Sequence, residues 1–175
     1  GAPANVLAMN SKLGGSSAFI GKVGNDAFGS YLKDTLSNHN IDITGMATDS
    51  NVPTTLAFVQ LDSKGDRSFS FYRNPGADMM LNADEVKKEL IDECKIFHFG
   101  SLSLTDEPCR KATYDAVNYA KKLGKIISFD PNYRSLLWSD REKAVNEISR
   151  AITMVDILKV SEEEMYLVTG ETNLE

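Results

Sequence analysis

The sequence predicts an α/β protein with a mainly parallel sheet and one inserted β-hairpin. Short apolar runs typical of buried strands alternate with segments of helical spacing, which favours parallel strands joined by crossover helices. Two β-rich runs, 54–61 and 68–72, interrupt this alternation. With 175 residues, 42% of them hydrophobic and 25% charged, the chain has a globular composition and enough length for a core.

The chain is predicted to begin with a helix. Its apolar residues continue to Leu13, and it ends at the Gly14-Gly15 pair because glycine accepts the backbone conformation that closes helices. An apolar strand over 17–23 follows. Asp26 then caps a second helix, whose apolar residues recur at helical spacing over 28–36.

The middle of the chain is predicted to form a β-hairpin. Its strands, 54–61 and 68–72, are joined by the polar loop 62–66. Inserted into an α/β chain, such a hairpin is either a decoration or a lid over a binding site. The predicted organisation is the start of an α/β domain at 1–49, a β lid at 50–75 and the continuation of the α/β domain at 76–175.

The second half returns to alternating strands and helices. Ser139 with Glu142, and Ser161 with Glu164, have the spacing of capping boxes that open helices. The predicted strands are 96–99, 125–129 and 157–160, and the predicted helices are 84–91, one from near Pro108 to Leu123-Gly124, one opened by Ser139 and one opened by Ser161.

The charge and the cysteine content argue against several classes of protein. A net charge of -6 disfavours a nucleic-acid partner, which needs a clustered basic face. The sequence has no apolar run of membrane-spanning length and no cleavable leader, so we expect no membrane partner. Cys94 and Cys109 lack a metal or redox spacing, which predicts reduced thiols in a cytoplasmic protein. No Walker-type phosphate loop and no nucleophilic triad can be recognised.

The loops after the strands are the first candidates for a binding site. In an open parallel sheet, ligands bind beyond the carboxyl ends of the strands, which selects the loops after Val23, Phe129 and Val160. The start of the chain is a further candidate. Gly1 and small residues lead into a helix whose first N–H groups are free, and Asn5 offers a donor and an acceptor to a hydroxyl. A plain helix start with a solvated Asn5 explains the same residues.

Arg73 stands at the end of the second hairpin run, directly after Phe71 and Tyr72. A guanidinium has several fixed donors, which suit vicinal hydroxyls or a carboxylate. Either aromatic ring could form an apolar wall for one face of a sugar. An ion pair with a surface carboxylate explains an arginine at a strand end equally well.

Asp130, Asn132 and Arg134 alternate along the loop after an apolar strand, and Pro131 fixes the turn between them. We expect the three side chains to project toward a common space, where Arg134 would clamp a phosphoryl oxygen or the substrate. An Asx-turn followed by a surface arginine is the alternative interpretation.

Ser161 and Glu164 support two compatible readings. They form a capping box, and Glu164 could also face Mg²⁺ through water, since carboxylates suit this ion.

These blocks resemble the signatures of a known family. The runs Gly1-Ala2-Pro3-Ala4-Asn5-Val6, Leu13-Gly14-Gly15 and Ile20-Gly21-Lys22-Val23-Gly24 are similar to the first signature of the ribokinase-like (PfkB) carbohydrate kinases. The block from Phe71 to Asp78 is similar to fructokinases. Leu7 departs from the signature, where Ser, Thr or Ala is usual, and Ser161 replaces the Asn of the family's Asn-x-x-Glu motif. The resemblance covers essentially all 175 residues, which correspond to the N-terminal half of a family member.

The resemblance implies a ribokinase-like three-layer α/β/α sandwich and the phosphorylation of fructose to fructose 6-phosphate, with ATP and Mg²⁺. It also implies a homodimer that forms through the hairpin lid. The implied sugar-binding residues are Gly1, Asn5, Phe71, Arg73 and Asn132; Arg134 is implied at the transferring phosphate, and Asp130, Ser161 and Glu164 on the ATP side, with Glu164 near Mg²⁺ through water.

The family's Gly-Ala-Gly-Asp motif, which supplies the catalytic base, does not occur in this sequence. We therefore expect the chain alone to lack kinase activity. Three alternatives remain open within the enzyme class: a ketodeoxygluconate kinase, for which Arg73 and Arg134 are equally suited, a ribokinase and a nucleoside kinase. A ribokinase-like protein that binds sugar or regulates without catalysis is the alternative from another class.

Overall fold

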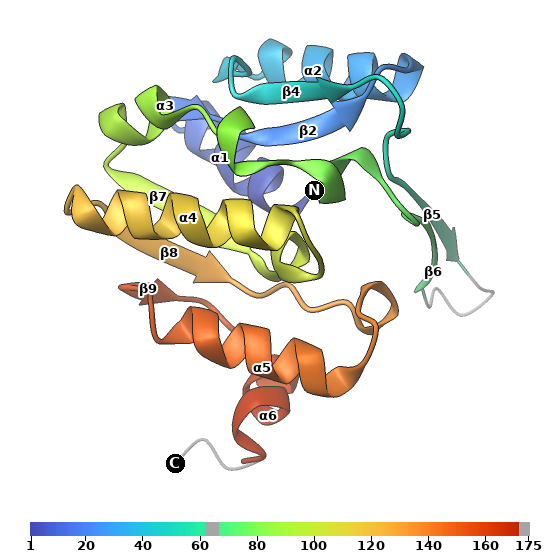
Figure 1. Ribbon diagram of the computed structural model, residues 1–175, viewed down its shortest axis with the longest axis vertical. Coiled ribbons are helices and arrows are strands. Elements are labelled where there is room, and N and C mark those ends of the chain that lie inside the picture. The colour runs from blue at the N-terminus through green and yellow to red at the C-terminus, as the bar shows by residue number, and fades with distance from the viewer. Residues whose placement is uncertain (62–66, 172–175) are drawn as a thin grey trace.

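The structure is a computed structural model that describes residues 1–61 and 67–171, and the predicted loop 62–66 lies outside this part of the chain (Figure 1). The helices are α1 (Ala2–Lys12), α2 (Ala27–Asn38), α3 (Lys88–Glu93), α4 (Cys109–Lys122), α5 (Arg141–Ile152) and α6 (Glu162–Thr169). The strands are β1 (Ser17–Ala18), β2 (Gly21–Gly24), β3 (Ile41–Asp42), β4 (Met46–Asp49), β5 (Leu56–Leu61), β6 (Arg67–Tyr72), β7 (Ile96–Gly100), β8 (Ile126–Asp130) and β9 (Ile157–Leu158).

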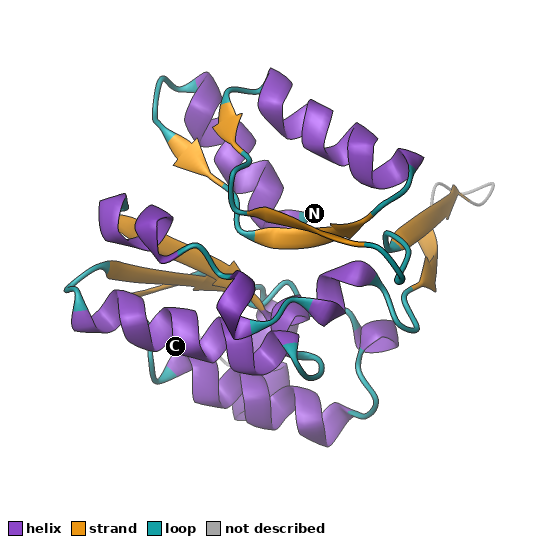
Figure 2. Ribbon diagram, turned by 45° about the horizontal axis from the view of Figure 1, so that its top comes forward, coloured by secondary structure: helices purple, strands orange, loops and turns teal. Residues whose placement is uncertain are grey.

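Parallel pairing dominates, and the predicted α/β class is confirmed. β1 pairs with β3, β2 pairs with β4, and β8 lies between β7 and β9, all in parallel. Helix α4 covers β7 and β8 on the side nearest the viewer in Figure 1, and α1 packs against β1, β3 and β7 from behind. The turned view also shows strands between helices (Figure 2). This arrangement has the three layers of an α/β/α sandwich.

The main core lies between the β7–β8 pair and the helices α4 and α5. Phe99 and Phe129 meet across the two strands with ring centroids 4.6 Å apart. Ile127, Val117 and Ile148 complete the centre of this cluster without measurable exposure. Burying such side chains contributes about 1.5–3 kcal/mol each. This core fixes the positions of the β7 and β8 ends, where the candidate residues lie.

Several predicted elements agree with the structure at their ends. Asp26 caps α2 by accepting the Gly29 N–H at 2.8 Å. Ser161 and Glu164 form both bonds of a capping box at the start of α6. Gly14 follows α1 with a φ of 88°, a conformation that favours glycine.

The predicted strand 17–23 is wrong as one element. The chain changes pairing partner in its middle, because the Phe19 N–H donates to Asp42 O beside β3 whereas the Gly21 N–H donates to Gly45 O beside β4. The two partner strands β3 and β4 themselves were not predicted. The apolar run is therefore two short strands, β1 and β2.

The predicted helix 84–91 is also only partly correct. A short 3₁₀ helix, η2 (Ala83–Glu85), occupies its start, because the Glu85 carboxylate accepts the Asn82 N–H and pairs with Lys22. Val86 and Lys87 are then extended, and α3 begins at Lys88.

The predicted capping box at Ser139 is wrong by one residue. Asp140 is the cap of α5, since its Oδ1 accepts the Lys143 N–H at 2.7 Å. The Ser139 hydroxyl instead donates to the Asp140 carboxylate at 2.9 Å. A carboxylate accepts an N–H bond more strongly than a hydroxyl, and it also suits the positive end of the helix dipole.

The hairpin of β5 and β6 is antiparallel, with Leu56 opposite Tyr72, and it extends away from the body of the molecule (Figure 1). Phe58 and Tyr72 meet edge to face on one side of it, with ring centroids 5.6 Å apart. Phe69 and Phe71 stack on the other side. Phe58 is 53% exposed and Tyr72 66%, so the hairpin presents apolar surface to solvent.

Candidate functional site

The ends of β7 and β8 and the start of α1 meet at one place. The Ser101 N–H, directly after β7, donates to Pro131 O after β8 at 3.0 Å. Gly100 ends β7 where a Cβ would lie 3.1 Å from Asp130 O and 3.9 Å from the Pro3 ring. This close approach brings three separate chain segments together beyond the carboxyl ends of β7 and β8, where ligands bind in open parallel sheets.

Arg73 lies just after β6 and is buried against this region. Its Nη1 donates to Thr105 Oγ1 at 2.9 Å, and its Nη2 donates to Leu102 O at 2.9 Å. Leu102 belongs to the 3₁₀ helix η3 (Ser101–Leu104), which follows β7. Nε donates to Asp78 Oδ2 at 2.7 Å, and Nη2 lies at 2.7 Å from the same oxygen. The side chain is only 5% exposed, so Arg73 joins the base of the hairpin to the loop after β7.

The start of α1 lies near the Arg73–Asp78 pair. Gly1 is exposed at the start of α1, and the charges of Asp78 and Arg73 both act on it. Asn5 is exposed on the first turns of α1. Phe71 is half-buried on the hairpin, where its ring stacks on Phe69. Gly1 and Arg73 are thus neighbours, and the Asn5 N–H donates to Gly1 O at 3.1 Å in the first turn of α1.

The loop after β8 contains the Asx-turn that the sequence offered as an alternative. The Asn132 N–H donates to Asp130 Oδ1 at 3.2 Å, and Asn132 has a φ of 46°. Asparagine tolerates this left-handed conformation better than most residues. Asp130 Oδ2 also pairs with Lys159 Nζ at 3.1 Å. The Asp130 carboxylate is therefore already engaged by the protein.

Glu164 ties α6 to the same loop. Its Oε1 accepts the Tyr133 N–H at 2.7 Å and its Oε2 accepts the Ser161 N–H at 2.9 Å. The residue is 7% exposed. Residues 1–61 and 67–171 contain no group of three or more His, Cys, Asp or Glu side chains that could hold a metal ion. Through its two hydrogen bonds, Glu164 anchors the loop that leads to Arg134.

Arg134 is an accessible cation just after the end of β8. It is exposed, and its Nη1 donates to the carbonyl of its neighbour Tyr133 at 2.8 Å. Within the described residues it forms no ion pair, so most of its donors face solvent at the end of β8. An exposed guanidinium beside an anchored loop suits an anionic oxygen.

Two groups at the base of the hairpin were not identified from the sequence. Asp78 accepts bonds from Arg73 and from the Thr55 hydroxyl. Asp26, predicted only as a cap, also accepts the Thr54 N–H and the Thr54 hydroxyl, each at 2.8 Å. The sequence offered one signal for Asp78, which is its acidic side chain five positions after Arg73. The threonine partners of Asp78 and Asp26 lie too far away in sequence to be recognised.

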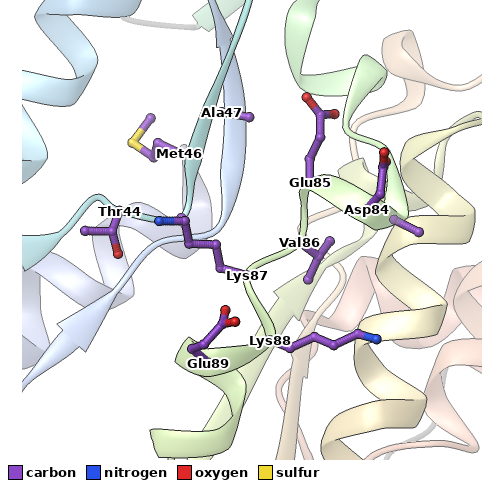
Figure 3. A pocket seen from close by; sticks show the side chains of 11 residues that line it. Thr44, Met46, Ala47, Asp84, Glu85, Val86, Lys87, Lys88 and Glu89 are labelled. Atoms are coloured by element: carbon purple, nitrogen blue, oxygen red, sulfur yellow. The ribbon is translucent and has the colours of Figure 1, made fainter.

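A separate hollow lies away from these residues. It has a volume of about 720 Å³ and is lined by residues 44–47 at the start of β4 and 83–89 of the η2–α3 segment (Figure 3). None of the candidate residues lines it. It lies near the amino end of β4, whereas the candidate residues gather beyond the carboxyl ends of β7 and β8.

The chain is similar to known proteins along nearly its whole length. The model of the pfkB family carbohydrate kinases matches residues 1–175. Probable fructokinase-7 of Arabidopsis thaliana is 50% identical over 170 residues, which are 97% of this chain and 50% of that protein. The fructokinase of Xylella fastidiosa with bound ATP superposes with a TM-score of 0.91 at 36% identity, over 97% of this chain and 52% of that one.

A fructokinase from Vibrio cholerae, solved with fructose, ADP and a calcium ion, has a TM-score of 0.89 at 35% identity and covers 99% of this chain and 56% of that one. The chain spans about half the length of the curated relatives it matches. These similarities confirm the ribokinase-like fold and the resemblance to fructokinases. The chain belongs to the pfkB family of carbohydrate kinases.

Proposed function

We propose that the complete protein containing this chain transfers a phosphoryl group from ATP to the 6-hydroxyl of fructose and so forms fructose 6-phosphate. The family match and the fructokinase relatives support a sugar kinase. The structures solved with ATP, and with fructose and ADP, support these two substrates. The candidate residues at the ends of β7 and β8 supply donors for a polyhydroxyl ligand and for an anion.

The Arg73–Asp78 pair is the observation that favours fructose over a sugar acid. Asp78 neutralises the Arg73 charge, and Thr105 Oγ1 and Leu102 O accept further hydrogen bonds from the guanidinium. An arginine whose charge is already paired gains less from a carboxylate than a free arginine does. Its remaining N–H can still donate to a neutral hydroxyl. Ketodeoxygluconate is therefore the second candidate substrate.

On the sugar side, we assign Gly1, Asn5, Phe71, Arg73 and Asn132. The free N–H groups at the start of α1 and the Asn5 amide would bind hydroxyls. Phe71 would provide an apolar wall. Arg73 would donate from the base of the lid, where burial holds its side chain in one orientation.

On the phosphate side, Arg134 would contact the transferring phosphoryl group, since its guanidinium is exposed and unpaired among the described residues. Asp130, Ser161 and Glu164 would lie on the ATP side. Their donor set does not fit direct binding of Mg²⁺, because Asp130 pairs with Lys159 and both Glu164 oxygens accept N–H bonds. Glu164 would meet Mg²⁺ through water, and the ion would arrive with ATP, whose charge it neutralises.

The chain alone is proposed to be inactive, because the Gly-Ala-Gly-Asp base motif of the family is not in its sequence. Loss of a positioned base costs about 10²–10⁴-fold in rate. Turnover of fructose by the purified 175-residue chain would contradict this proposal.

The complete protein is proposed to be a cytoplasmic homodimer that pairs through the hairpins. Phe58, Val59 and Tyr72 are each more than half exposed there, and pairing would cover them. No helix in residues 1–61 and 67–171 combines the length and apolarity needed to cross a bilayer. Light scattering at micromolar concentration tests the dimer, and a purely monomeric mass would refute it.

The function is tested by ADP release from the complete protein with Mg-ATP and, separately, fructose, ribose, ketodeoxygluconate and adenosine. The proposal expects the highest kcat/KM with fructose. A higher kcat/KM with ketodeoxygluconate would identify the sugar acid, and not fructose, as the substrate. Release with none of the four would instead support a binding or regulatory protein.

A further inference from the structure

Asp78 contacts the residues that flank both hairpin strands at the base of the hairpin. It lies in the 3₁₀ helix η1 (Ala77–Met80), outside the hairpin itself. Its Oδ1 accepts the hydroxyl of Thr55, which directly precedes β5, and its Oδ2 accepts from Arg73, which directly follows β6. One carboxylate therefore closes the open end of the hairpin.

The backbone beside Asp78 is shaped for this contact. Gly76 lies so close to Thr55 that a Cβ would collide with the threonine hydroxyl, and it would also lie 2.8 Å from Asp78 Oδ1. Any side chain at Gly76 would have to displace one of these groups. The approach of η1 to the hairpin base thus depends on a glycine in this position.

Asp78 is also the counter-charge of a buried arginine. The Arg73 side chain is 5% exposed, whereas that of Asp78 is 41% exposed. The other two partners of the guanidinium, Thr105 Oγ1 and Leu102 O, carry no charge. Removal of the Asp78 charge would leave the guanidinium buried without compensation, and Arg73 would gain by rotating toward water.

The first hairpin strand has a second, separate anchor. Thr54 is held by Asp26 through two bonds of 2.8 Å. Because this anchor does not involve Arg73, loss of Asp78 would release Arg73 while Asp26 still holds the start of β5. The two carboxylates therefore have separable roles at the hairpin base.

We propose that Asp78 is a positioning residue for sugar binding, which fixes the Arg73 guanidinium and the base of the lid relative to the loop after β7. The proposal rests on the proposed function, in which Arg73 donates to the sugar. Asp78 itself need not touch the substrate. Its effect on the sugar site is transmitted through Arg73.

Steady-state kinetics of the complete protein test this role. Asp78→Asn keeps the size of the side chain and removes its charge, and we expect the KM for fructose to rise about tenfold while the KM for ATP stays within about twofold. Asp115→Asn is the matched control, because within the described part of the chain Asp115 pairs with Lys111, on the exposed face of α4. An unchanged fructose KM in Asp78→Asn, or an equal rise in the control, would overturn the proposal.

A double-mutant cycle separates positioning from general destabilisation. In an Arg73→Ala background, Asp78→Asn should raise the fructose KM by less than about twofold, because the residue through which it acts is gone. A persistent tenfold effect in that background would show that Asp78 does not act through Arg73.

Hydrogen exchange supplies a readout that does not depend on activity. Asp78→Asn should raise amide exchange in segment 67–78 of the complete protein more than Asp115→Asn does. Unchanged exchange in this segment would overturn the proposal that Asp78 clamps the hairpin base through Thr55 and Arg73. A wild-type protein without activity on any sugar would refute the proposed function and the substrate role of Asp78, but the exchange result would still decide whether the clamp exists.

Discussion

Lys22 is a buried lysine that pairs with two carboxylates. Its replacement by methionine is the sharpest test of what these ion pairs contribute to stability. Its Nζ pairs with Asp49 at 3.1 Å and Glu85 at 2.9 Å, and donates to Met80 O at 3.1 Å. These contacts join β2, β4 and η2. Lys22→Met keeps the approximate length of the side chain and leaves both carboxylates without their cation.

The cost can be worked from the exposure of the three groups. Breaking a fully buried ion pair costs about 3–5 kcal/mol. The Lys22 side chain is 7% exposed, but those of Asp49 and Glu85 are 13% and 28% exposed, so water can compensate the carboxylates in part. We therefore expect a loss of about 2 kcal/mol for Lys22→Met, which lowers the Tm of a chain of this size by about 4–8 °C.

The pH dependence of this effect follows from three pKa shifts. Burial lowers the pKa of Lys22, but hydrogen bonds and charges from Glu85 and Asp49 outweigh it and raise the pKa above 10.5. N–H bonds from Asn51 and the contact with Lys22 lower the pKa of Asp49 below 3.8. Burial opposes the shift at Glu85, but its N–H and Lys22 contacts lower the pKa below 4.5.

The sign of each contribution is then fixed. The carboxylates contribute stability above their ordinary pKa values, and this stability is lost as the pH falls through their lowered values. Lys22 contributes stability below 10.5, and this is lost as the pH rises through its raised pKa. The difference between wild type and Lys22→Met should be greatest between about pH 5 and 10 and smaller at pH 3.

Thermal unfolding followed by circular dichroism measures these differences. Lys111→Met is the control, since Lys111 is 69% exposed and its pair with Asp115 lies in solvent. The control should shift Tm by less than about 1 °C. A Lys22→Met shift no larger than that of the control, or one that persists fully at pH 3, would refute the reasoning.

The remaining predictions concern the candidate phosphate clamp and a helix cap. Arg134→Ala in the complete protein should lower kcat about 10²-fold with little change in the fructose KM, and steady-state kinetics with an unchanged kcat would remove Arg134 from the phosphate site. Asp140→Ala should lower the Tm by about 2–4 °C, whereas Ser139→Ala should change it by less than about 1 °C. If Ser139→Ala lowered the Tm more than Asp140→Ala, Ser139 and not Asp140 would be the cap of α5, as the sequence predicted.

The parts of the fold that were predicted correctly depend on local signals. The cap at Asp26, the capping box of Ser161 and Glu164, and the strand predicted over 125–129, which is β8, each follow from residues that lie within a few positions of one another. Such patterns act over short distances along the chain. They fix helix starts and apolar strands without reference to the rest of the molecule.

The elements that were predicted wrongly or missed depend on contacts between residues that are distant in the sequence. The helix predicted over 84–91 is interrupted because Glu85 pairs with Lys22, 63 residues away. The break between β1 and β2 reflects a change of partner strand, which no local pattern encodes. The two-residue strand β3 is too short to leave a periodic signal.

The same distinction applies to the site. The sequence placed Arg73 at the end of a strand, but its partners Leu102 and Thr105 lie 29 and 32 residues away. Glu164 was recognised as a cap, and its bond to the Tyr133 N–H appears only in the fold. Residue type therefore selected the candidate residues, while the fold shows which of them are already engaged by the protein.

The most direct test of the central claim is identification of the product by ³¹P and ¹³C NMR after the complete protein has been incubated with Mg-ATP and fructose. The account predicts fructose 6-phosphate, formed in step with ADP. Phosphorylation at another hydroxyl, or no phosphorylated sugar at all, would contradict it.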